Sequence, residues 1–165
     1  MATPTALPST FTANTVLPAA SLNLLRGAFR VLQVVTATTS TQTTHNSTTY
    51  TTTNLTATIT PQYNTSTILV LAFVNGTIKG AENSANALNL EILRGATQIQ
   101  EVKNLHLTDT AVKVIGTCFM QVMDSPATTA ATTYVVNGKN STATFTVATQ
   151  FGSTKSVILL AEISA

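Results

Sequence analysis

The stretch Leu55-Thr-Ala-Thr-Ile-Thr60 alternates strictly between apolar and threonine side chains. Successive side chains of a β-strand point to opposite faces, so this period of two predicts a strand with one buried and one solvent-facing side. Leu55, Ala57 and Ile59 are expected on the buried face. Pro61 follows directly and predicts the end of the strand, because proline has no backbone N–H for a sheet ladder.

Two continuous apolar runs lie on the C-terminal side of this strand, Thr67-Ile-Leu-Val-Leu-Ala-Phe-Val74 and Val157-Ile-Leu-Leu-Ala-Glu-Ile163. A short continuous apolar run is typical of a strand that is buried on both faces. Both runs are therefore expected in the centre of the core. Asn75-Gly76 follows the first run and predicts a turn there.

The remaining sequence repeats the pattern of strands separated by turn residues. Residues 87–94 alternate with Leu88, Leu90 and Ile92 inward, and Arg94-Gly95 predicts a turn. The Thr-rich tract 38–54 is expected to form a loop and one exposed strand. Further strands are expected over 30–38, 111–123 with a bulge at Gly116, 132–136 before a turn at Asn137-Gly138, and 141–147, whereas 99–107 is ambiguous.

Composition agrees with an all-β chain. Only 8% of the 165 residues are charged, 44% are hydrophobic, mean hydropathy is +0.26, and 35 residues are threonine. Charged residues make up about 25% of an ordinary globular protein. Disordered chains and coiled coils are also rich in charge, so this composition disfavours both. About eight or nine strands without a convincing helix predict an antiparallel β-sandwich or jelly roll over residues 29–165.

Residues 1–28 are expected to form an extended N-terminal arm. Pro4, Pro8 and Pro18 oppose both helix and ladder pairing. Residues 21–26 allow one helical turn or a short strand. The apolar residues of the arm indicate that it docks on another surface.

Charge and targeting signals exclude several classes of partner. The net charge is +2 and the eight basic residues are scattered, so no stripe for nucleic acid is present. The sequence has no run of 18 apolar residues, so no transmembrane helix is predicted. The N-terminus lacks the basic start of a secretory signal. Cys118 lies alone in an apolar run and is interpreted as a small buried hydrophobe.

The inventory of catalytic groups is thin. Two histidines and six carboxylates show no metal-ligand spacing and no nucleophile or phosphate-binding motif, although His106 and Asp109 are three residues apart. Asp124 is interpreted as a turn former, and Glu162 as an outward residue or a partner across a subunit contact. We therefore expect neither an enzyme nor a metal or other cofactor.

Taken in order, several segments resemble a β-rich domain of virion structural proteins of tailed bacteriophages. The resemblance spans about residues 29–165 and is carried by residues 30–38, 50–61, 68–72, 90–95, 123–129, 133–136 and 157–163. It implies a virion surface protein, a trimer of jelly-roll-like domains, and no catalytic residues. In fibre-like proteins such a domain ends a longer chain, whereas an arm of about 28 residues is too short for a fibre shaft.

The leading functional hypothesis is therefore a capsid cement or decoration protein. It would bind the major capsid protein on the exterior of the virion head, after synthesis and assembly in the host cytoplasm, and stabilise the shell. For Leu22 to Phe29, a first strand in the protein's own core is an equally open interpretation. The candidate docking or inter-subunit residues are Phe11, Val16, Leu17, Leu22, Leu24, Leu25 and Phe29.

The alternative hypothesis is a small tail fibre-tip or receptor-binding protein. Aromatic rings often stack on sugars, so Tyr50, Tyr63 and Tyr134 are the candidate contacts with a host surface glycan. Packing at a strand end or at the edge of the core is the competing interpretation of these tyrosines.

Overall fold

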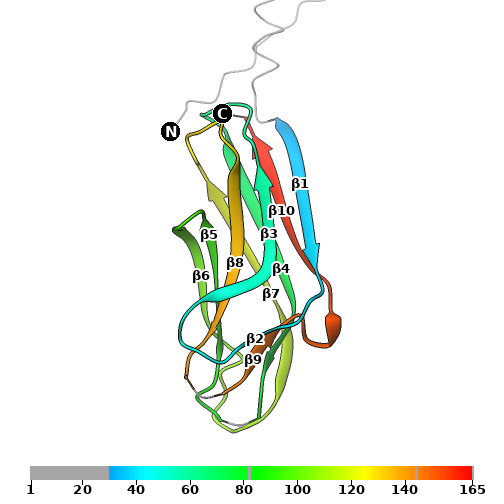
Figure 1. Cartoon of the computed structure of the whole chain (residues 1–165), viewed down its shortest axis with the longest axis vertical. Helices are drawn as coiled ribbons and strands as arrows, with labels where there is room; N and C mark the ends of the chain where they lie inside the picture. The colour runs from blue at the N-terminus through cyan, green and yellow to red at the C-terminus, as the bar shows by residue number, and fades with distance from the viewer. Residues whose placement is uncertain (1–29, 82, 144, 165) are drawn as a thin grey trace, which may run out of the picture.

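The computed structural model describes residues 30–81, 83–143 and 145–164, which form two antiparallel sheets packed face to face (Figure 1). Figure 1 shows β1 and β10 along one side of the molecule and β5 and β6 along the other. Apart from one short 3₁₀ turn, Phe151–Ser153, the elements of the described residues are strands. The prediction of an all-β sandwich is confirmed.

Each sheet is built from strands that are distant in sequence. The larger sheet has the order β1 (Val31–Thr39), β10 (Ser156–Ile163), β4 (Thr67–Lys79), β9 (Val147–Thr149) and β2 (Thr43–His45), with β7 (Val114–Asp124) also paired to β4. The smaller sheet has the order β3 (Thr51–Ile59), β8 (Thr132–Asn140), β5 (Leu88–Arg94) and β6 (Thr97–Leu105).

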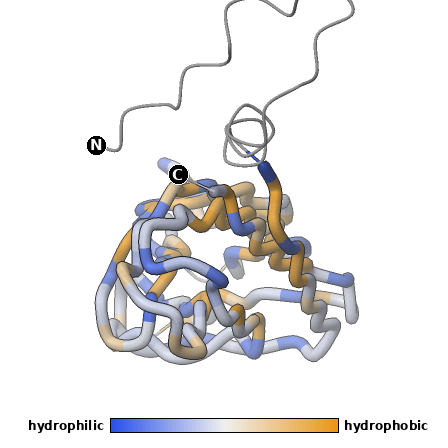
Figure 2. The backbone as a smooth tube through the Cα atoms, turned by 90° about the horizontal axis from the view of Figure 1, so that it is seen from above, coloured by the Kyte–Doolittle hydropathy of each residue, from blue (hydrophilic) through white to orange (hydrophobic). Residues whose placement is uncertain are grey.

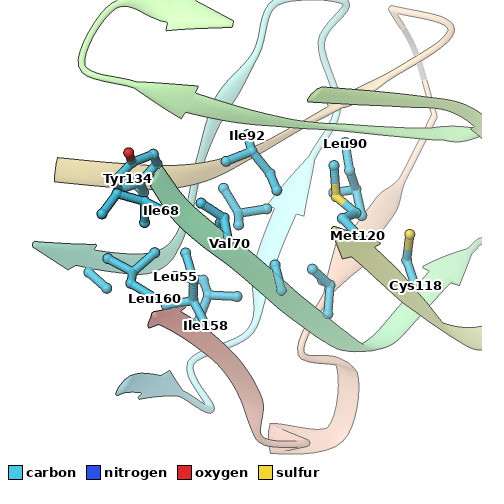
Figure 3. Close-up of a cluster of buried hydrophobic side chains, with 14 of the residues drawn as sticks. Leu55, Ile68, Val70, Leu90, Ile92, Cys118, Met120, Tyr134, Ile158 and Leu160 are labelled. Atoms are coloured by element: carbon cyan, nitrogen blue, oxygen red, sulfur yellow. The ribbon is translucent and has the colours of Figure 1, made fainter. Parts of the chain in front are cut away.

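The core lies between the two sheets and follows the predicted alternation. Leu55, Ala57 and Ile59 of β3 and Leu90 and Ile92 of β5 are all buried, which confirms the inward face expected for both strands. Figure 3 shows these side chains meeting those of β4, β7 and β10 in the space between the sheets. Burial of this apolar area stabilises the fold by about 25 cal/mol per Å².

The two apolar runs lie side by side, as expected, but the first is not buried on both faces. β10 pairs with β1 and β4, and so lies inside the larger sheet. In β4, Ile68 and Val70 are fully buried, whereas Phe73 is 45% exposed. The prediction of complete burial for this run was wrong, because the sheet has no second layer of described residues on its outer side.

The Asn75-Gly76 turn was also a wrong prediction. β4 continues through both residues to Lys79, and Gly76 forms a bulge where the pairing with β7 shifts between Asn75 and Thr77. Gly76 has a φ of 60°, in the left-handed region that favours glycine. The dipeptide therefore produces a bulge instead of reversing the chain.

Two other glycines make room for histidine rings. Gly138 lies inside β8 and not in the predicted turn, and a Cβ built on it would come within 2.7 Å of Nε2 of His45. A Cβ on Gly116 in β7 would come within 2.7 Å of Cε1 of His106. In that ladder the bulge lies on β4, so Gly116 serves the histidine contact and not the predicted bulge.

We expect Gly138→Ala to lower the free energy of unfolding by about 1–3 kcal/mol, because the new methyl group overpacks a buried contact with His45. Urea titrations followed by circular dichroism measure this change. In a His45→Ala background the same substitution should be nearly neutral, since the clashing ring is gone. An equal cost in both backgrounds would contradict the proposed contact.

Other differences concern local structure. The ambiguous segment becomes β6, whereas the strand expected over 141–147 was misplaced, since β9 (Val147–Thr149) overlaps it only at Val147. The tract 38–54 holds the end of β1, all of β2 and the start of β3. Figure 2 shows β1, the first described strand, as a largely apolar stretch. The expected arm lies outside the described residues.

Two carboxylates, Glu162 fully buried and Asp124 partly buried, connect elements that the sequence leaves unrelated. Glu162 of β10 is fully buried and accepts hydrogen bonds from Nε2 of Gln33 at 2.6 Å and the backbone N–H of Gln62 at 2.7 Å. It thereby ties β1 and the β3–β4 connection to β10. The prediction that Glu162 points outward or pairs with a cation was wrong.

Asp124 is the last residue of β7 and joins the two sheets. Its Oδ1 lies 2.7 Å from Nη1 of Arg94 at the end of β5, and its Oδ2 accepts a 2.7 Å hydrogen bond from the Tyr134 hydroxyl of β8. Its interpretation as a simple turn former was therefore wrong.

Candidate interaction surface

The outer side of the larger sheet carries an apolar surface, which we call face A. Core side chains of β1, β10, β4 and β7 alternate with it, so it is formed by the outward residues of these strands. The strand registers place them in three rows: Val34/Ala161/Leu69/Met123, Thr36/Leu159/Leu71/Gln121 and Thr38/Val157/Phe73/Phe119. Most are apolar and none is ionisable.

The third row contains an exposed aromatic pair. Phe73 and Phe119 face each other across β4 and β7, with ring centroids 4.5 Å apart and planes inclined by 35°. They are 45% and 47% exposed, and Met123 further along β7 is 54% exposed. Large apolar side chains in one contiguous array mark an interaction site more often than a free surface.

The outer side of the smaller sheet has a different chemistry. Its outward positions include Thr56 and Thr58 of β3 and a row formed by Asn137, Glu91 and Glu101. Lys103 forms a 3.1 Å ion pair with Glu101 beside this row. The protein therefore has one sheet face suited to water and one that is not.

The seven candidate docking residues lie outside the described residues. Phe11, Val16, Leu17, Leu22, Leu24, Leu25 and Phe29 all belong to residues 1–29, so their role stays a prediction. Residue 30 leads directly into β1, whose Val34 and Thr36 contribute to face A.

Tyr134 does not belong to any contact surface. Its side chain is fully buried, and its hydroxyl donates to Asp124. Burial and this hydrogen bond raise the pKa of the Tyr134 hydroxyl. The proposal of Tyr134 as a glycan contact was therefore wrong, because β8 directs its even-numbered residues into the core.

Tyr50 and Tyr63 do not form one site either. Tyr50 precedes β3 and Tyr63 follows it, so they flank a nine-residue strand of about 30 Å. Tyr63 is 57% exposed. The Tyr50 hydroxyl donates to Glu101 at 2.7 Å, and Nζ of Lys139 lies 4.3 Å from its ring centroid. One face of the Tyr50 ring is thus already occupied.

The titratable groups of the described part of the chain are dispersed. Within it, no group of three or more His, Cys, Asp or Glu side chains is placed to hold a metal ion. His45 bonds to Thr51 through Nδ1, and burial lowers its pKa to about 4. His106 bonds to Thr77 instead of approaching Asp109, and burial lowers its pKa as well. Cys118 is buried, as predicted, and burial raises the pKa of its thiol.

A small hollow lies near β9. Its volume is about 220 Å³, and Lys113 reaches over the Phe151 ring beside it at 4.5 Å. Ligand pockets usually span about 300–1,000 Å³, so this hollow is small for an organic ligand.

Among the helices of the described residues, none has the length and apolarity needed to cross a membrane.

No protein-family model matches the chain, and no curated protein matches it. Face A is thus the main surface feature that the geometry supplies. Sequence reasoning missed it because a continuous apolar run was interpreted as burial on both sides. The sequence signal for face A is the set of apolar residues at odd-numbered positions. It lies in residues 67–74, 115–123 and 157–163.

Proposed function

We propose that this chain is a structural protein of a bacteriophage virion, and specifically a capsid cement or decoration protein on the head exterior. The observation that carries the proposal is face A, an uncharged apolar sheet surface of the kind proteins cover by assembly. The resemblance of residues 29–165 to phage virion domains supports the same class. The expected assembly is a homotrimer bound to the major capsid protein.

The physical role would be mechanical. Each copy bound across a junction of capsid subunits adds binding free energy that must be lost before the shell opens. Many copies act together even if each binds modestly. The residues expected to contact the shell are those of 1–29 named above, which leaves face A for a separate contact.

The test uses particles of the phage that encodes the chain. Gold-labelled antibody against the chain should mark the whole head surface, and particles lacking the chain should release DNA at a lower temperature. Adding back the purified full chain should restore the release temperature. Labelling confined to the tail tip would replace this proposal by the fibre-tip alternative, for which Tyr63, which is exposed, and Tyr50, which is half-buried, are the remaining candidate contacts. Unlabelled particles would contradict both.

A further inference from the structure

The contrast between the two sheet faces shows what face A is suited to contact. The outer side of the smaller sheet carries polar residues, with Thr56 and Thr58 exposed to water and Glu101 partly exposed. Face A uses Leu, Val, Met and Phe at the corresponding outward positions, with Thr36, Thr38 and Gln121 as its polar members. Such a surface is incomplete without an apolar partner.

Charge selects the kind of partner. Because no residue of the three rows is ionisable, two copies of face A meet without like-charge repulsion in any relative orientation. An acidic or basic partner would lose hydration here and gain no ion pair. Neighbouring copies of this chain in the expected homotrimer offer matching apolar chemistry.

The size of face A also fits self-association. Four strands about 4.8 Å apart and three rows about 6.6 Å apart cover roughly 400 Å² of flat area. A stable interface buries about 800 Å² per partner, and upright side chains expose more area than their footprint. Val31 and Ile115, 59% and 54% exposed, extend the apolar area beyond the rows.

We propose that face A is the surface through which copies of this chain contact one another, with the Phe73–Phe119 pair as its anchor. Buried aromatic side chains contribute most of the binding energy in many interfaces. The proposal deepens the proposed function by naming the assembly surface, but it rests on face A and needs no capsid for its test.

The experiment measures the mass of the full chain by light scattering over a range of concentrations. Wild-type chain is expected to form an oligomer. Phe119→Glu should weaken the association by about 30-fold or more, because a charge would be buried among apolar groups. Thr58→Glu is the matched control, since it adds the same charge to an outward β3 position, and should leave the mass unchanged.

Folding and capsid binding are measured separately. Circular dichroism must show the same sheet content in both variants, and Met123→Glu on the same face replaces Phe119→Glu if that chain does not fold. A monomeric wild-type chain, or a Phe119→Glu oligomer as tight as wild type, overturns the inference. A monomer that loses shell binding on Phe119→Glu assigns face A to the capsid instead, overturning this inference while leaving the proposed function intact. An oligomer that does not bind the head supports this inference and overturns the proposed function.

Discussion

Glu162→Ala is expected to lower the free energy of unfolding by about 3–5 kcal/mol, as measured by urea titration at pH 7. The carboxylate is fully buried and accepts hydrogen bonds from Gln33 and from the backbone N–H groups of Gln62 and Tyr63. Its removal takes the acceptor from the two backbone N–H groups, leaves Gln33 with only its bond to the Thr60 carbonyl, and leaves a cavity. Asp109→Ala is the control, because the Asp109 side chain is exposed at the surface.

The pH dependence gives a second measurement on the same residue. Burial raises the pKa of Glu162, but hydrogen bonds from Gln33 and the backbone N–H groups of Gln62 and Tyr63 outweigh it and hold the pKa below its ordinary value of 4.5. A lowered pKa in the folded state stabilises the fold above pH 4.5, and this contribution is lost as the pH falls through the folded pKa. The stability difference between wild type and Glu162→Gln should therefore shrink in that acidic range. A pH-independent difference would contradict this assignment.

Tyr134→Ala is expected to cost about 3–5 kcal/mol, the usual range for removing a large buried aromatic side chain. Tyr134→Phe should cost about 1.5–3 kcal/mol, because it removes only the hydrogen bond to the Asp124 carboxylate. Thermal and urea unfolding of both variants measure these values. Tyr63→Ala serves as the control and should change stability by less than about 0.5 kcal/mol, since Tyr63 is 57% exposed. Equal effects at Tyr134 and Tyr63 would mean that Tyr134 is not in the core.

The fold was predictable where local pattern and tertiary role coincide. Strict alternation in residues 55–60 is imposed by one buried and one wet face, and β3 has both. In residues 87–94 the same alternation predicted the strand and its inward residues, although Asn89 and Glu91 are buried as well. The turns predicted at Asn75-Gly76 and Asn137-Gly138 were wrong because distant residues determine the roles of the two glycines. Gly76 forms a bulge at a register shift against β7, and Gly138 makes room for the His45 ring. Nothing in the neighbouring sequence records those contacts.

The candidate site was less predictable for a related reason. An apolar run looks the same whether its outer side is covered by the same chain or by another one. The pairing of Leu69, Leu71 and Phe73 with β7 and β10 had to be known before face A became visible. The roles of Asp124 and Glu162 likewise depend on donors 10 to 129 residues away.

The placement of β10 between β1 and β4 has a consequence for biosynthesis. Val31 pairs with Ile163, so the larger sheet cannot close until residues 156–163 have emerged from the ribosome. Sheets joined by such distant contacts fold slowly, in milliseconds to seconds. Until β10 is synthesised, the edge of β4 that pairs with it is open, and β4 has apolar side chains on both faces. Such a state is prone to aggregation. We therefore expect the nascent chain to be most prone to aggregation before β10 has paired with β4.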